Sequence, residues 1–73
     1  MDKRKLPKMP VERIIKKVSS SQGIKRVSKE AVNEMIRVLE ERAISMSKQA
    51  SQLAEHAGRK TIKADDIELA YIK

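Results

Sequence analysis

Apolar residues recur along the chain at intervals of three and four, which is the spacing of one face of an α-helix. The first such stretch begins at Pro10, which suits the first helical position because its missing N–H would be unpaired there anyway. The run from Ser19 to Gly23 should stop it, since glycine tolerates the left-handed backbone of a helix end. The pattern therefore predicts a short first helix. Its apolar stripe consists of Val11, Ile14, Ile15 and Val18.

A second and much longer helix is predicted between Ser28 and Gly58. Ser28 is a favourable N-cap, Glu30 suits the positive end of the helix dipole, and Val27 can pack against Val32. Because Gly and Pro are absent until Gly58, the helix can run for about 29 residues. Its apolar positions alternate between spacings of four and three, as in a helix that packs along its whole length. This seam consists of Val32, Ile36, Leu39, Ala43, Met46, Ala50, Leu53 and Ala57.

A third, short helix is predicted from about Lys63 to the C-terminus, after the connector 59–62. Asp65 and Asp66 fall in its first turn, where the helix dipole favours acids. They could be read as a metal pair, but neighbouring helical residues point about 100° apart, so helix-start acids are the better interpretation. The chain is thus predicted to be all-α, with a short, a long and a short helix.

The length of the middle helix predicts a second chain. At about 1.5 Å per residue it would be about 43 Å long, whereas a compact globule of 73 residues is roughly 29 Å across. Two short helices cannot cover a seam of that length, so we expect a dimer in which the long helices cross. The residues expected at its core are Ile36, Leu39, Ala43, Met46 and Ala50.

The composition excludes most chemistry. The chain has no Cys, Phe or Trp and a single His, His56, so thiolate metal sites, nucleophile–base pairs and stacking platforms are not expected. No apolar run approaches the roughly 18 residues of a membrane span. A basic amphipathic helix on an anionic membrane would need bulky aromatic or leucine-rich insertion residues, and the chain has none to spare. We therefore expect a cytoplasmic protein that is not an enzyme and has no cofactor, metal or small-molecule substrate.

Positive charge is concentrated near the N-terminus. The chain carries 17 Lys and Arg against 10 Asp and Glu, a net charge of +7, and residues 1–30 hold ten of the bases against three acids. A smaller basic cluster follows at residues 59–63. Such a surface could simply be solubilising, or it could serve an anionic partner. Residues 1–8 are interpreted as a basic arm and residues 9–73 as a single domain.

The fifteen residues from His56 to Ala70, with Leu6-Pro7 and Pro10, the stretch 13–16 and Arg26-Val27-Ser28, resemble the archaeal histones. The resemblance covers roughly residues 6–71 and implies a histone fold in which two chains form a handshake dimer. It also implies that the paired first helices and loops line a convex basic face that follows a DNA duplex. Between Lys16 and Arg26, however, the chain has several residues more than is usual for the family.

Carried over position by position, the resemblance implies three sets of functional residues. Arg59 and Asp66 would form an ion pair that holds the second loop, and Leu53, His56 and Asp66 would join one dimer to the next. The residues that would contact DNA are Arg13, Lys16, Arg26, Arg59, Lys60, Thr61 and Lys63.

The function expected from this resemblance is sequence-non-specific binding, bending and wrapping of double-stranded DNA in the nucleoid. The partners would be DNA, a second histone in a homodimer or heterodimer, and further dimers in a tetramer or longer assembly. The alternative is a histone-fold subunit that uses the handshake only to assemble a protein complex. An acidic surface in place of the basic one would mark such a protein.

Overall fold

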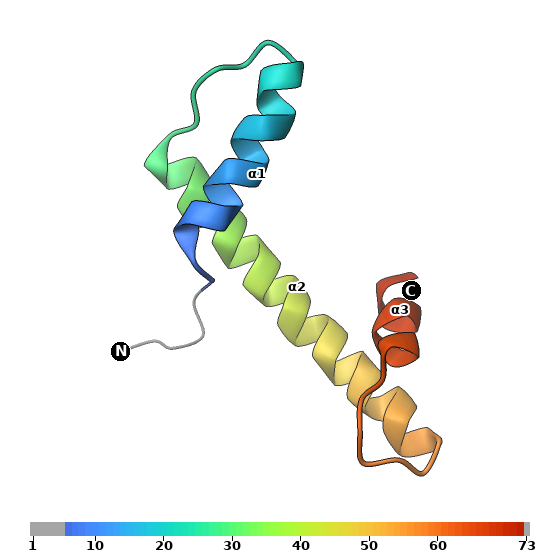
Figure 1. The fold of residues 1–73 in the computed structure, drawn as a ribbon. Coiled ribbons are helices and arrows are strands. Elements are labelled where there is room, and N and C mark those ends of the chain that lie inside the picture. Colours follow the sequence, from blue (N-terminus) through green and yellow to red (C-terminus); the bar gives the residue numbers. More distant parts are fainter. Residues whose placement is uncertain (1–5, 73) are drawn as a thin grey trace. The chain divides into compact units, whose positions relative to one another are not determined.

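The computed structural model describes residues 6–72, which form three helices and no strand (Figure 1). They are α1 (Lys8–Ser21), α2 (Lys29–His56) and α3 (Ala64–Ile72). The all-α class and the order of short, long and short helices are confirmed. The basic triplet of the expected arm, residues 3–5, lies outside the described residues, and the expected division into an arm and one domain stays a prediction.

Helix α1 is longer at both ends than the apolar pattern indicates. It begins at Lys8, so Pro10 is its third residue; the first four N–H groups of a helix have no partner within it, and proline is tolerated there. It continues through the serines to Ser21, although the run from Ser19 was expected to stop it. Helix α1 is closed by N–H donation from Gly23 to the Ser20 carbonyl and from Ile24 to the Ser19 carbonyl, both at 3.0 Å. Gly23 has φ +84°, the left-handed residue of a Schellman end.

Helix α2 begins and ends at the predicted signals. The Ser28 hydroxyl accepts a hydrogen bond from the Ala31 N–H at 3.0 Å, which caps the first turn. At the other end Gly58 has φ +72° and donates to the Glu55 carbonyl, while the Arg59 N–H reaches back to the Ala54 carbonyl, both at 2.9 Å. This is a second Schellman end, so both glycines of the chain terminate helices.

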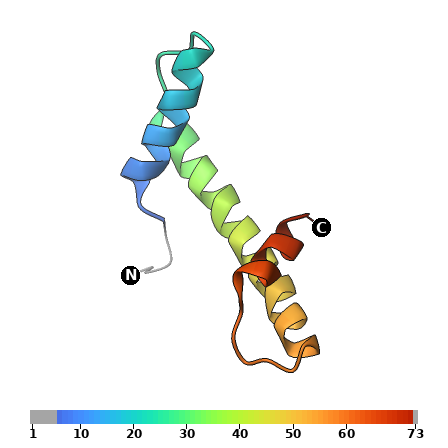
Figure 2. The same ribbon diagram turned by 45° about the vertical axis from the view of Figure 1, so that its right-hand side comes forward.

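Close contacts divide the chain into two compact units, Met1–Glu40 and Glu41–Lys73. In the first unit α1 lies beside the first part of α2 in both views (Figures 1 and 2). Val11 of α1 forms a buried cluster with Val32 and Ile36 of α2, against which Ile15 and Val27 pack. The Leu6 N–H donates to the Glu40 carboxylate at 2.8 Å and fixes the segment before α1.

In the second unit α3 lies beside the last part of α2 (Figures 1 and 2). Its buried residues are small or paired: Ala50 and Ala54 of α2 with Ala70 and Asp66 of α3. The Arg42 guanidinium lies 5.9 Å from the centroid of the Tyr71 ring, a cation–π contact between the two helices. Ala54 is buried although it was not part of the predicted seam, whereas Ala57, the last seam position, lies beyond the last helical residue and is exposed.

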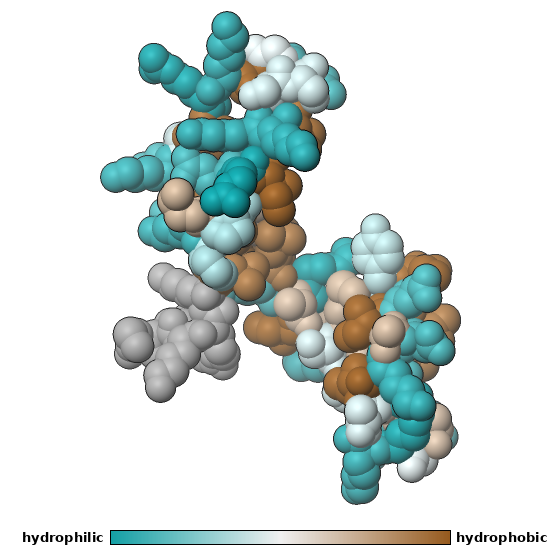
Figure 3. Space-filling view, in the orientation of Figure 1, coloured by the Kyte–Doolittle hydropathy of each residue, from teal (hydrophilic) through white to brown (hydrophobic). Residues whose placement is uncertain are grey.

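The middle of the α2 seam remains uncovered. In the first unit Met35, Val38 and Leu39 are 41%, 44% and 40% exposed; in the second, Ala43 is exposed and Met46 only half-buried. Apolar surface is visible in each unit in the space-filling view (Figure 3). Two of the five residues predicted at the dimer core, Ile36 and Ala50, are already buried within the chain's own units. The dimer core itself stays a prediction.

Candidate nucleic-acid interface

The loop between α2 and α3 is held by the Arg59 side chain. Its guanidinium donates to both carboxylate oxygens of Asp66 at 2.9 Å, a bidentate pair. One of the same nitrogens, Nη1, also donates to the Thr61 carbonyl at 2.8 Å. Arg59 therefore fixes the loop backbone from one side and the first turn of α3 from the other. The structure brings together the two residues that the resemblance implied as an ion pair.

Asp66 is the buried centre of this arrangement, with 2% of its surface exposed. Its Oδ2 also accepts the Lys63 N–H at 2.8 Å, so the carboxylate caps the helix that contains it. The hydrogen bonds from Arg59, and next the one from Lys63, lower the pKa of Asp66 from 3.8 to about 2, although burial opposes them. The same pair raises the pKa of Arg59. Both groups therefore stay charged at neutral pH.

This clamp leaves the other basic residues of the loop exposed. Lys60, Thr61 and Lys63 are all accessible, whereas the Arg59 side chain is 28% exposed because it is turned toward Asp66. Lys63 immediately precedes α3, whose first N–H groups give that end a partial positive charge. Two lysines, a hydroxyl and a helix start on an immobilised loop are suited to phosphate oxygens. Arg59 positions the loop with three of its five N–H donors, so within residues 6–72 Nη2 and Nε each keep one N–H for a further acceptor.

The remaining predicted DNA-contacting residues belong to the first unit. Arg13 and Lys16 are on α1 and Arg26 is in the connector before α2; all three are accessible to solvent. Lys16 also forms an ion pair with Glu12, one helical turn earlier, at 3.2 Å. The structure therefore places three of the seven predicted residues in the unit Met1–Glu40 and four in the unit Glu41–Lys73.

The three residues expected between dimers differ in accessibility. His56 is the last residue of α2 and is exposed, Leu53 is half-buried, and Asp66 is buried. Within residues 6–72, Oδ1 of Asp66 accepts one hydrogen bond and Oδ2 accepts two, so Oδ1 keeps a free lone pair. Any further donor to Asp66 would have to reach that one oxygen.

Other features of the site escaped the sequence pattern. The Thr61 carbonyl and the Lys63 N–H become partners of the clamp through the fold of the loop. Asp66 is the third residue of α3, the position from which an acid can bond back to the residue before the helix, and this spacing could have predicted its contact with Lys63. Ala54 lies four residues after the buried Ala50, on the same side of the helix, and this spacing could have predicted that Ala54 is buried as well.

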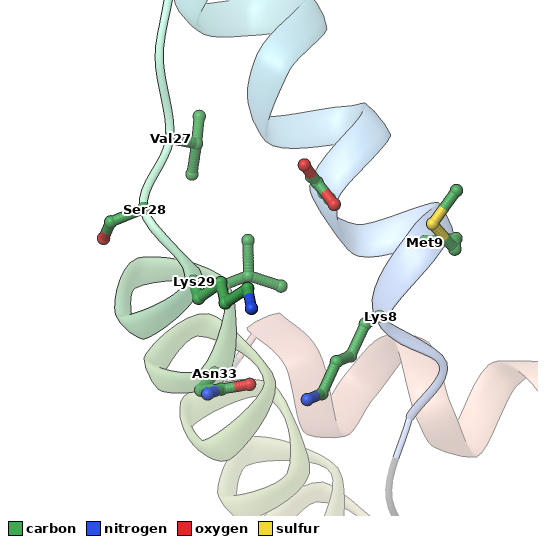
Figure 4. A pocket seen from close by; sticks show the side chains of 8 residues that line it. Lys8, Met9, Val27, Ser28, Lys29 and Asn33 are labelled. Carbon is green, nitrogen blue, oxygen red and sulfur yellow. The ribbon is translucent and has the colours of Figure 1, made fainter.

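A pocket of about 260 Å³ lies between the starts of α1 and α2 (Figure 4). Lys8 of α1 and Asn33 of α2 point toward one another across it, and Met9 and Val27 contribute apolar wall. In residues 6–72 there is no cluster of three potential metal ligands. No helix of that part is long and apolar enough to cross a membrane.

Comparison with known proteins agrees with this geometry. A family model described as histone-like transcription factor (CBF/NF-Y) and archaeal histone matches residues 4–71. The chain is 46% identical over 65 residues to one of the subunits of archaeal histone HAN1 of Thermococcus zilligii, covering 89% of this chain and 91% of that protein. It is 40% identical, over the same shares, to probable archaeal histone 3 of Methanocaldococcus jannaschii. The three helices observed are consistent with the fold of that family.

Proposed function

The chain belongs to the family of histone-like transcription factors and archaeal histones, and we propose that it binds, bends and wraps double-stranded DNA without sequence specificity. Archaeal histones are DNA-packaging proteins and not enzymes. The protein would act in association with the chromosome.

The observation that carries the proposal is the clamped loop. Arg59 and Asp66 hold it from within, while Lys60 and Lys63 remain exposed. A loop whose conformation is fixed before binding loses little entropy when its cations meet phosphates. Phosphate contacts orient a protein on the duplex and carry no direct base information, which supports binding that is indifferent to sequence.

Affinity would come chiefly from charge. The chain has a net charge of +7, and each phosphate neutralised by Lys or Arg releases condensed counterions. Sequence preference would then reflect how readily a given duplex bends. Arg13, Lys16, Arg26 and Thr61 would add contacts to those of the clamped loop.

A second chain is part of the proposal. Met35, Val38 and Leu39 leave apolar surface open on α2, and the exposed Ala43 follows in the same helix. A handshake partner, either a second copy or another histone, would cover this surface. Leu53, His56 and Asp66 would join such dimers into a tetramer or a longer assembly on DNA.

A salt titration tests the proposed function. If a dimer neutralises about six to eight phosphates, the slope of log K against log salt should be roughly −5 to −7 for any duplex of sufficient length. Replacing Lys60 with Ala in both chains of the dimer should reduce the magnitude of that slope by up to about 2 and weaken all duplexes alike. Loss of affinity for one sequence alone would contradict phosphate recognition.

The alternative is a histone-fold subunit that assembles with proteins and does not wrap DNA. The exposed lysines of the loop favour DNA, since a protein used only for assembly has no use for an immobilised basic loop. Absence of duplex binding by a folded dimer, together with assembly with another protein, would support this alternative.

A further inference from the structure

Helix α1 continues past Val18 through Ser21, where it is closed by N–H donation from Gly23 to the Ser20 carbonyl and from Ile24 to the Ser19 carbonyl. Lys17 is therefore in the interior of a helix of 14 residues, four positions from its end.

Helical geometry divides α1 into three sectors. Val11 and Ile15 face α2, with Val11 8% exposed. Ile14 and Val18 form an apolar flank that is 65% and 59% exposed. At about 100° per residue, Arg13 and Lys17 point away from the side of Val11 and share one face, one turn apart.

The cations on the side of α1 that points away from α2 are Arg13, Lys16 and Lys17, and they differ in whether an acid is paired with them. The Lys16 ammonium forms an ion pair with the carboxylate of Glu12, one helical turn earlier, with 3.2 Å between Nζ and Oε2. Within residues 6–72, neither Arg13 nor Lys17 has an ion pair. A phosphate that approaches α1 meets two uncompensated cations at Arg13 and Lys17, and at Lys16 a cation whose charge is partly neutralised.

We propose that Lys17 is an additional DNA-contacting residue, which extends the contact of Arg13 by one phosphate along the same strand. The proposal rests on the proposed function, because it assumes that the outer face of α1 meets DNA. Arg13 and Lys17 are separated by about 6 Å along the helix axis, so both long side chains can reach neighbouring phosphates. Lys17 thus enlarges the basic face of each chain.

The test compares single-lysine variants in a salt titration with a mixed-sequence duplex, using the full chain. Lys17→Ala should reduce the magnitude of the slope of log K against log salt by about 1 to 2, because a dimer loses two phosphate contacts. Over a fourfold increase in salt, the native protein then loses about 4- to 16-fold more affinity than the variant. Lys17→Arg should keep the native slope, since it preserves the charge.

Two matched variants separate position from net charge. Lys48→Ala removes the same charge from an exposed position on α2 outside the proposed interface, and it should leave the slope unchanged. Lys16→Ala should reduce the slope less than Lys17→Ala, because Glu12 already compensates part of the Lys16 charge. Sedimentation and circular dichroism establish that each variant is a folded dimer; alanine favours an exposed helix, so folding is expected to persist.

Two results would overturn the assignment of Lys17: a native slope in Lys17→Ala, or an equal reduction in Lys48→Ala. If Lys60→Ala reduces the slope while Lys17→Ala does not, the proposed function stands and the role of Lys17 alone is wrong. If the native protein binds no duplex, the proposed function fails and this inference fails with it.

Discussion

A charge placed at Ala43 distinguishes a chain that folds alone from one that folds with a partner. Ala43 lies near the middle of α2 and is exposed within its own chain. In a monomer, Ala43→Glu would be an ordinary surface substitution, which usually changes stability by no more than about 0.5 kcal/mol. In a handshake dimer, the same carboxylate would be buried at the crossing of two helices, without a partner.

The exposure of the neighbouring side chains gives the magnitude. Met35, Val38 and Leu39 are each about two-fifths exposed, which together is slightly more than one fully exposed side chain. Full burial of such a side chain contributes about 1.5–3 kcal/mol, so covering the three contributes about 2–4 kcal/mol per chain. The burial of an unpaired carboxylate costs several kcal/mol in each chain, which offsets most or all of this gain. A cost of about 6 kcal/mol in the dimer would weaken association by about four powers of ten.

Sedimentation equilibrium and thermal unfolding over a series of protein concentrations measure this effect. The native chain should sediment as a folded dimer whose melting temperature rises with concentration, because association of the two chains stabilises only the folded state. The Ala43→Glu chain should be an unfolded monomer under the same conditions. Ser45→Glu is the matched control, since Ser45 is exposed on the same helix and lies about 200° around the axis from Ala43.

Two results would refute the reasoning. A native chain that is a folded monomer at micromolar concentration would show that its own helices suffice. A dimer of Ala43→Glu as stable as that of Ser45→Glu would show that chains associate through another surface. In either case the uncovered seam of α2 would need another explanation.

Three further predictions concern the clamped loop and its surroundings. The lowered pKa of Asp66 means that the unfolded chain binds this proton more readily, so the contribution of Asp66 to stability is present above pH 3.8 and is lost as pH falls toward about 2; Asp66→Asn should show a shallower fall of melting temperature over that window. Gly58→Ala should destabilise the chain by roughly 1–2 kcal/mol in urea unfolding, because Gly58 has φ +72° and a new Cβ meets no atom within 4 Å, so backbone strain alone acts. His56→Ala should leave folded dimers that bind DNA but shorten the duplex protected from nuclease; an unchanged protection ladder would show that His56 is only a surface residue.

The sequence determined the elements because their signals are local. Ser28 caps α2 and Gly58 ends it through contacts with residues only three to five positions away. Such interactions form within one turn and need no tertiary partner. The start of α1 was predicted less well, because Pro10 is compatible with each of the first helical positions and its apolar pattern does not select one. The extension through Ser21 was missed because serines are weak helix formers whose conformation depended on the closing turn at Gly23.

Only the tertiary structure decided which apolar residues are buried and which charged residues are paired. Ile36 and Leu39 have the same role in the periodic pattern, yet Ile36 is covered by α1 and Leu39 is left exposed, because α1 reaches only the first part of α2. Lys16 and Lys17 are adjacent and chemically identical, yet among residues 6–72 only Lys16 is paired with an acid. Periodicity states which side of a helix is apolar, whereas burial and pairing depend on where other elements end and which groups they bring within contact distance.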